Sequence, residues 1–240
     1  VTGYRGSPLG GVDATFSKAE KFLKKNNIKF QYGLNEDLAA TAVWGSQQTE
    51  LRNEGKYDGV FGLWYGKGPG VDRCGDVFRH SNLAGTSKFG GVLVAMGDDH
   101  SAESSTELHQ SEYALVDAMM PILSPAGVQD ILDFGIQGWA LSRYSGLWVG
   151  IKCLKDTIEV TEVVDASYDR VNIVIPEDKH HEALNIRLGD TAQAREDRLH
   201  NKKLRAAKMF ARANNLNKIH YSPVEKKIGI ISAGKSWLDT

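Results

Sequence analysis

Residues 33–48 read Gly-Leu-Asn-Glu-Asp-Leu-Ala-Ala-Thr-Ala-Val-Trp-Gly-Ser-Gln-Gln, and they combine a turn with the start of a helix. They follow residues 28–32, whose apolar side chains alternate as in a half-buried strand. After the glycine turn, Asn35 stands where an N-cap would satisfy the first free amides of a helix. Glu36 and Asp37 then fall in the first helical turn, where the helix dipole favours carboxylates. The stretch therefore predicts a strand that leads directly into a helix.

Two interpretations of Glu36 follow from this position. In an open α/β fold, ligands bind at the C-terminal edge of a parallel sheet, and a carboxylate just after a strand lies at that edge. Alternatively, Asn35, Glu36 and Asp37 form an ordinary charged helix start. Periodicity alone favours the ordinary helix start.

Outward from this unit, strand patterns alternate with helical spacing up to about residue 155. The further apolar segments that we expect to be strands are residues 1–4, 57–64, 89–97, 120–125 and 147–153. Helical spacing is found in residues 14–26, 71–84 and 129–144. This alternation predicts an α/β fold with a doubly wound parallel sheet of about six strands. Residues 157–175 are rich in valine and isoleucine, and we expect them to form edge structure.

The composition changes after Pro176 and suggests three segments. Residues 1–178 form the α/β domain, which begins in mid-strand. Residues 179–225 form a polar helical connector, and residues 226–240 begin another α/β domain. We interpret the sequence as an excerpt from a longer protein.

The chain has 240 residues with 29 basic and 30 acidic side chains, a formal net charge of -1. This balance does not indicate a nucleic-acid or membrane surface. The basic part of the connector lacks the interleaved aromatic residues of stacking recognition, so we interpret it as a solvated helix. Its cationic residues are Arg195, Arg198, Lys202, Lys203, Arg205, Lys208 and Arg212. The absence of a signal peptide or transmembrane run indicates a cytoplasmic protein.

Several polar or glycine-rich segments follow the expected strands. Residues 5–11 and 65–70 are glycine-rich turns that let a ligand approach the backbone, but neither has the spacing of a P-loop. Arg73, beside the second turn, is the best candidate there to face a ligand. The residues at 98–100, Asp-Asp-His, suit metal binding or chain turning, and we favour turning. Cys74 and Cys153 lie far apart without a CxxC motif, so the sequence predicts no metal site in this chain.

Taken in order, several of these segments resemble one family. They are the Gly6-Ser7-Pro8 turn, Asn35-Glu36 at a helix start, residues 90–99, Ser104-Ser105 followed by Gln110, and residues 227–236. The set resembles the thiamine-diphosphate-dependent 2-oxoacid:ferredoxin oxidoreductases, most closely the indolepyruvate (arylpyruvate) branch. The resemblance spans nearly the whole chain and covers the pyrimidine-binding domain, the connector and the opening of the next domain.

The resemblance assigns roles to residues in this chain. It implies that Glu36 is the carboxyl group that hydrogen-bonds the pyrimidine ring of thiamine diphosphate. Gly6, Ser7 and Asn35 would line the pyrimidine site, and Arg5 or Arg73 would meet the substrate carboxylate. The cofactor carries the difficult chemistry of 2-oxo acid decarboxylation.

The resemblance also implies what other parts of the enzyme supply. Those parts would hold the diphosphate with its magnesium ion and the 4Fe-4S clusters. The partners would be a 2-oxoacid, coenzyme A, ferredoxin and the domains or subunits that complete the site, in a homodimer or larger assembly. The products would be an aryl-acetyl-CoA, carbon dioxide and reduced ferredoxin.

The sequence departs from the family in ways that leave the substrate open. Arg5 stands where many members have proline, and His-Ser-Ala-Glu follows Asp98-Asp99 in place of a Pro-Gly-Pro-His run. Two other hypotheses therefore stay open. One is a different thiamine enzyme, such as a decarboxylase or a transketolase relative. The other is a structural module that kept the fold and mediates subunit contacts without catalysis.

Overall fold

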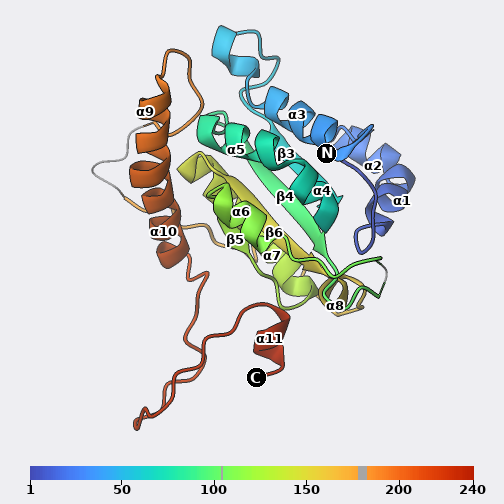
Figure 1. Cartoon of the computed structure of the whole chain (residues 1–240), viewed down its shortest axis with the longest axis vertical. Helices are drawn as coiled ribbons and strands as arrows, with labels where there is room; N and C mark the ends of the chain where they lie inside the picture. The colour runs from blue at the N-terminus through green and yellow to red at the C-terminus, as the bar shows by residue number, and fades with distance from the viewer. Residues whose placement is uncertain (104, 178–182) are drawn as a thin grey trace.

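The computed structural model describes residues 1–103, 105–177 and 183–240, and they form one six-stranded sheet flanked by helices (Figure 1). All neighbouring strands are parallel, in the order β2-β1-β3-β4-β6-β5. The strands are β1 (Thr2–Gly3), β2 (Gln31–Tyr32), β3 (Phe61–Lys67), β4 (Gly91–Asp98), β5 (Ile122–Leu123) and β6 (Trp148–Leu154). The predicted doubly wound parallel sheet is confirmed.

The centre of the sheet is held by three long strands. Every residue of β4 is buried, and β4 pairs with β3 from Phe61↔Gly91 to Lys67↔Gly97 and with β6 from Val92↔Trp148 to Asp98↔Leu154. Parallel strands covered on both faces need apolar residues throughout, which explains the continuous run Gly-Val-Leu-Val-Ala-Met in β4. The strands β1, β2 and β5 are two residues each.

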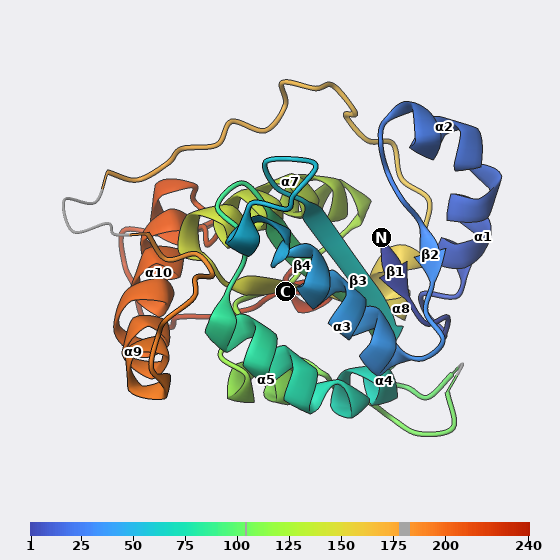
Figure 2. The same ribbon diagram turned by 90° about the horizontal axis from the view of Figure 1, so that it is seen from above.

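Helices cover both faces of the sheet (Figure 2). They are α1 (Gly11–Lys18), α2 (Glu20–Lys25), α3 (Glu36–Ser46), α4 (Gly68–Arg73), α5 (Gly75–Ala84), α6 (Glu112–Asp117), α7 (Val128–Ser145), α8 (Lys155–Ile158), α9 (Ala192–Asp197), α10 (Leu204–Ala213) and α11 (Lys235–Leu238). A 3-10 turn, η1 (Thr49–Arg52), follows α3. No helix in the described part of the chain has the length and apolar character needed to cross a bilayer.

Alternate residues of β4 point to opposite faces of the sheet. Val92, Val94 and Met96 pack with residues of α3, α4, α5 and α6. Leu93 packs on the other face with residues of α7 and α10. The period-two alternation of a strand thus divides the helices into two layers.

The glycine-rich segment 65–70, which we expected to be a loop, is a strand end joined directly to a helix. β3 continues to Lys67 and α4 begins at Gly68. Pro69 lies in the first turn of α4, where its missing amide costs no hydrogen bond. A Cβ on Gly68 would lie 2.0 Å from Nδ1 of His109, so this glycine permits close packing. The helix expected over residues 71–84 is divided at Cys74 into α4 and α5.

The expected edge structure of residues 157–175 is wrong beyond the short helix α8. The described residues 159–177 contain no strand, and this segment runs alongside α7 (Figure 2). Polar side chains attach it: Arg170 pairs with Asp133 at 2.8 Å, and Glu162 accepts a hydrogen bond from the amide of Val128 at 2.9 Å. The segment therefore follows a helix surface, and its valines at 160, 163 and 174 stay exposed.

The C-terminal region differs from a solvated connector. α9, a π-helical segment labelled η2 (Arg198–Lys203) and α10 are consecutive, and Phe210 enters the core shared with α7. Arg198 and Lys203, which we interpreted as solvated, are 2% and 0% exposed. Residues 227–234 form no strand with the rest of the described chain, and Ile228 and Ile231 are exposed. The proposed boundary at 178/179 lies outside the described residues, and the division into domains stays a prediction.

Candidate functional site

The sheet has a topological switch point between β1 and β3. The chain passes from β1 outward to β2 and then returns to the other side of β1 as β3. In doubly wound folds the crevice at the C-terminal ends of such strands is where ligands bind. Here β1 leads to the Gly6-Ser7-Pro8 turn, β2 leads to Asn35-Glu36, and β3 leads to α4.

The start of α3 is fixed by two hydrogen bonds. The side-chain Oδ1 of Asn35 accepts a hydrogen bond from the amide of Leu38 at 2.9 Å, so the predicted N-cap is confirmed. The carbonyl of Glu36 accepts a hydrogen bond from Nε1 of the buried Trp64 at 3.1 Å. The first bond defines where the helix begins, and the second attaches that end to β3.

Removing this cap gives a first prediction. Asn35→Ala should lower the free energy of unfolding by ~1 kcal/mol, because the amide of Leu38 loses its acceptor. Asn35→Asp should keep most of the stability, since aspartate is an equally good N-cap. Urea unfolding followed by circular dichroism measures both variants. Equal stability of wild type and Asn35→Ala would show that the cap contributes nothing.

Close contacts join Glu36 to α4 and the Gly6 turn to the end of β3. A Cβ built on Gly70 would lie 2.6 Å from Cγ of Glu36, so the Glu36 side chain lies directly against α4. A Cβ on Gly6 would lie 2.9 Å from Cβ of Lys67, the last residue of β3. The turn also contains a cis peptide bond between Ser7 and Pro8, and Pro8 packs on Gly97 near the end of β4.

The side chain of Glu36 is half-buried, and the described residues offer its carboxyl group no hydrogen-bond or ion-pair partner. Beneath it, Cys74 is fully buried. Burial raises the pKa of the Cys74 thiol, and the nearby carboxylates of Asp37 and Glu36 raise it further. Cys74 is thus a neutral packing residue and not a nucleophile.

The two candidate arginines lie at different places on this edge. Arg73, at the end of α4, pairs through Nε with Oδ2 of Asp37 at 2.9 Å. Arg5 is exposed at the start of the turn that contains Ser7. Neither arginine is buried, so both guanidinium groups can meet solvent or a bound molecule.

A histidine that we did not select from the sequence lies beside the site. His109 packs on Gly68, two residues before the glycine that contacts Glu36. Its Nε2 is 2.8 Å from Oδ2 of Asp72, and its Nδ1 is 3.7 Å from Oδ1 of the buried Asp98. The sequence places His109 after β4, which is the one signal that could have identified it. The pattern of the residues between them does not predict that the chain comes back to the end of the sheet.

The polar residues after β4 have a structural role. The buried carboxylate of Asp98 accepts hydrogen bonds from the amide and the hydroxyl of Ser111, at 2.9 and 2.6 Å. Among the described residues, no group of three or more His, Cys, Asp or Glu side chains is placed to hold a metal ion. The predicted turn residue Asp98 therefore fastens Ser111 to the end of β4. Ser104, from the motif quoted above, lies outside the described residues.

These features define the class: a doubly wound α/β protein with a half-buried carboxylate beside its switch point. No known protein-family model matches the chain. It is similar to the indolepyruvate oxidoreductase subunit IorA of Methanothermobacter marburgensis, with 24% identity over 231 residues. That similarity covers 96% of this chain and 35% of IorA, so the chain spans about a third of that relative. It supports a relationship to subunits of the 2-oxoacid:ferredoxin oxidoreductases.

A solved structure also matches part of the fold. It is a 2-oxoglutarate:ferredoxin oxidoreductase from Magnetococcus marinus with 2-oxoglutarate, coenzyme A and succinyl-CoA bound. The match covers 64% of this chain and 26% of that chain, with 17% identity and a TM-score of 0.49. A match of this size does not indicate a function.

Proposed function

We propose that this chain provides the pyrimidine-binding part of a thiamine-diphosphate-dependent 2-oxoacid:ferredoxin oxidoreductase. The substrate in this proposal is indolepyruvate or another arylpyruvate, and the products are an acyl-CoA, carbon dioxide and reduced ferredoxin. The observation that carries the proposal is Glu36, a carboxylate without a protein partner among the described residues, at the switch point of the sheet. The similarity to IorA supports the reaction class.

The residues at this edge fit the pyrimidine half of the cofactor. The carboxyl group of Glu36 is free to accept or donate one hydrogen bond to a ring nitrogen. A side chain at position 70 would overlap Glu36, and one at position 6 would overlap Lys67, so both glycines permit these close contacts.

Each residue then has a specific task. Bound thiamine diphosphate would supply the carbanion chemistry that decarboxylates 2-oxo acids. Glu36 would hold a proton at its carboxyl oxygen and exchange it with the pyrimidine nitrogen. The backbone of Gly6 and Ser7 and the start of α3 at Asn35 would orient the ring. Arg5 or Arg73 would bind the substrate carboxylate, as guanidinium groups do in a bidentate manner.

In this proposal, other domains or subunits complete the site. They hold the diphosphate, the magnesium ion and the 4Fe-4S clusters, and the assembly is a homodimer or larger. Because Glu36 is half-buried in this chain, a partner surface would exclude water from its carboxyl group. The proposed location is the cytoplasm.

A substrate and acceptor assay of the full enzyme tests the proposal. With indolepyruvate, coenzyme A and oxidised ferredoxin under anaerobic conditions, ferredoxin reduction should require all three. Pyruvate and 2-oxoglutarate serve as matched substrates that report specificity. Carbon dioxide release without coenzyme A or ferredoxin would instead identify another thiamine enzyme, and no turnover of any 2-oxo acid would favour the structural module.

A further inference from the structure

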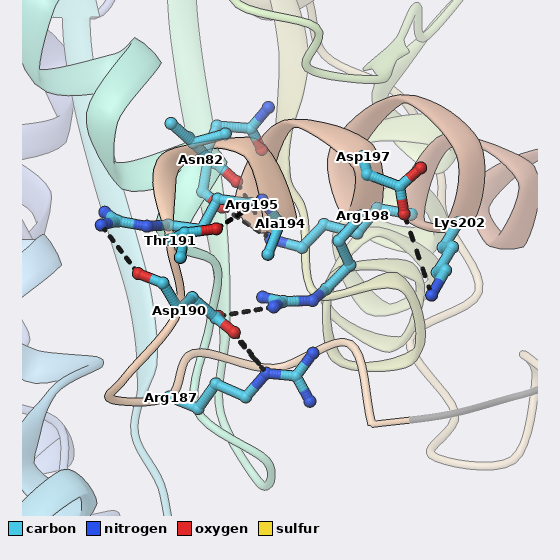
Figure 3. Close-up of polar contacts among 11 residues, drawn as sticks. Asn82, Arg187, Asp190, Thr191, Ala194, Arg195, Asp197, Arg198 and Lys202 are labelled. Atoms are coloured by element: carbon cyan, nitrogen blue, oxygen red, sulfur yellow. Dashed lines mark hydrogen bonds and ion pairs between the residues drawn. The ribbon is translucent and has the colours of Figure 1, made fainter.

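Three arginines gather around one aspartate where the C-terminal helices begin (Figure 3). Arg187 approaches the carboxylate of Asp190 through Nε, at 3.2 and 3.3 Å from its two oxygens. Arg198 reaches the same carboxylate through Nη2 at 2.5 Å, and Arg195 donates to the backbone carbonyl of Asp190 at 3.3 Å. We call Arg187, Arg195 and Arg198 the arginine cluster.

Among the residues that the structure describes, positive charge exceeds negative charge around the cluster. Lys203, which is fully buried, donates to the carbonyls of Asn82 and Leu83 at 3.2 and 3.1 Å. Burial, followed by repulsion from Arg198 and Arg187, lowers the pKa of Lys203 to about 7, with Asp190 opposing the shift. Among the described residues, Asp190 is the carboxylate in contact with these arginines, so one anion faces several cations.

Donor groups in the cluster are left without acceptors. The Arg198 side chain is 3% exposed, yet its Nη1 has no hydrogen-bond partner among the described residues. The buried Nε of Arg195 lacks one as well. Leaving guanidinium donors buried and unpaired is costly, so an acceptor from outside the described chain would be stabilised here.

The cluster lies near the N-terminal ends of the strands, whereas Glu36 lies near their C-terminal ends. The amide of Ile186, next to Arg187, donates to the carbonyl of Thr86 at 2.9 Å, and residues 85–90 lead into the N-terminal end of β4. The cluster is therefore independent of the proposed cofactor site. Access from solvent is along Arg187, whose side chain is 42% exposed.

Space for an organic group adjoins this entrance. Leu188, the residue after Arg187, lines a surface hollow of about 370 Å³ whose lining also includes the acidic residue Glu54 and, nearer the start of the same segment, Thr49 and Arg52. These two residues belong to η1, which follows α3 at the same edge of the sheet. The hollow is large enough for a small organic group attached to an anion.

We propose that the arginine cluster binds a phosphate group, free or carried by a small organic ester, between Arg187 and Arg198. Guanidinium groups bind phosphate through paired N–H donors, and the phosphate oxygens would satisfy the unpaired Nη1 of Arg198. Asp190 holds the two guanidinium groups in place from one side and leaves their other donors to the ligand. The ligand would also neutralise the excess positive charge that surrounds Lys203.

Titration calorimetry with inorganic phosphate tests the proposal on the purified full-length protein at constant ionic strength. Wild type should bind saturably, and Arg198→Met and Arg187→Gln should each weaken binding ~10- to 100-fold through loss of charge-assisted hydrogen bonds. Arg212→Gln, which removes an exposed arginine from α10, is the matched control and should bind like wild type. Adenosine monophosphate as a second titrant separates an ester site from a site for free phosphate.

A second readout comes from protons. Near pH 8, binding should take up a fraction of a proton, because an added anion raises the pKa of Lys203. Repeating the titration in buffers of different ionisation enthalpy measures this uptake. If Arg198→Met does not fold, the more exposed Arg187→Gln decides. The proposal is overturned if neither titrant binds saturably, or if Arg187→Gln binds as tightly as wild type.

Discussion

Glu36→Gln should slow ferredoxin reduction by the full enzyme ~10²–10⁴-fold, the usual cost of losing a positioned proton-transfer group. Glutamine has nearly the same shape and still forms hydrogen bonds, but it cannot exchange a proton with the pyrimidine nitrogen. The fold should be unchanged, because the helix start depends on the Asn35 cap and on the bond from Trp64 to the backbone carbonyl of Glu36.

Deuterium exchange at the thiazolium carbon of bound thiamine diphosphate measures the effect directly, and calorimetry shows whether the variant still binds the cofactor. Asp76→Asn is the matched control, since it removes an exposed carboxylate on α5 and should keep wild-type exchange. Unchanged exchange in Glu36→Gln, with cofactor bound, would remove Glu36 from the mechanism and leave it as an ordinary helix-start residue.

The sheet could be predicted because its signals are local. The buried run of β4 and the turn with its N-cap at Asn35 each specify their own structure within a few residues. Topology also predicts that Glu36 and the Gly6 turn follow strands whose C-terminal ends lie at the same end of the sheet, because β2, β1 and β3 are parallel.

Tertiary contacts determined the parts that could not be predicted. The pattern of residues 65–70 suggested a loop. Gly68 and Gly70 instead allow His109 and Glu36 to pack directly against the backbone of α4. Arg198 and Lys203 lie in a polar sequence that is typical of a solvated helix. Its periodicity does not predict that Asp190 pairs with Arg198 or that α5 packs on Lys203. His109 lies between Asp98 and Ser111, whose hydrogen bonds bring the chain back to the end of β4.

Lys203 should make the stability of the protein depend on pH above neutrality. Burial and the nearby Arg198 and Arg187 lower its pKa from an ordinary value of 10.5 to about 7 in the folded chain. Between these two values the unfolded chain binds more protons than the folded chain, so the free energy of unfolding rises with pH. The slope should approach about 1.4 kcal/mol per pH unit and accumulate to roughly 5 kcal/mol across the window. Below about pH 7 the cost of burying the charged ammonium group is fully present.

Comparison with Lys203→Met isolates this contribution from other groups that titrate in the same range. Methionine fills a similar volume but carries no proton, so the stability difference between wild type and variant should increase in favour of wild type from pH 7 to pH 10. Lys202→Met, at a more exposed position whose side chain faces Asp197, should show a nearly constant difference. Urea unfolding at half-unit pH steps provides the data. A flat difference for Lys203→Met would mean that the ammonium group keeps its ordinary pKa in the folded protein, either because water reaches it or because a bound anion already balances the arginine cluster.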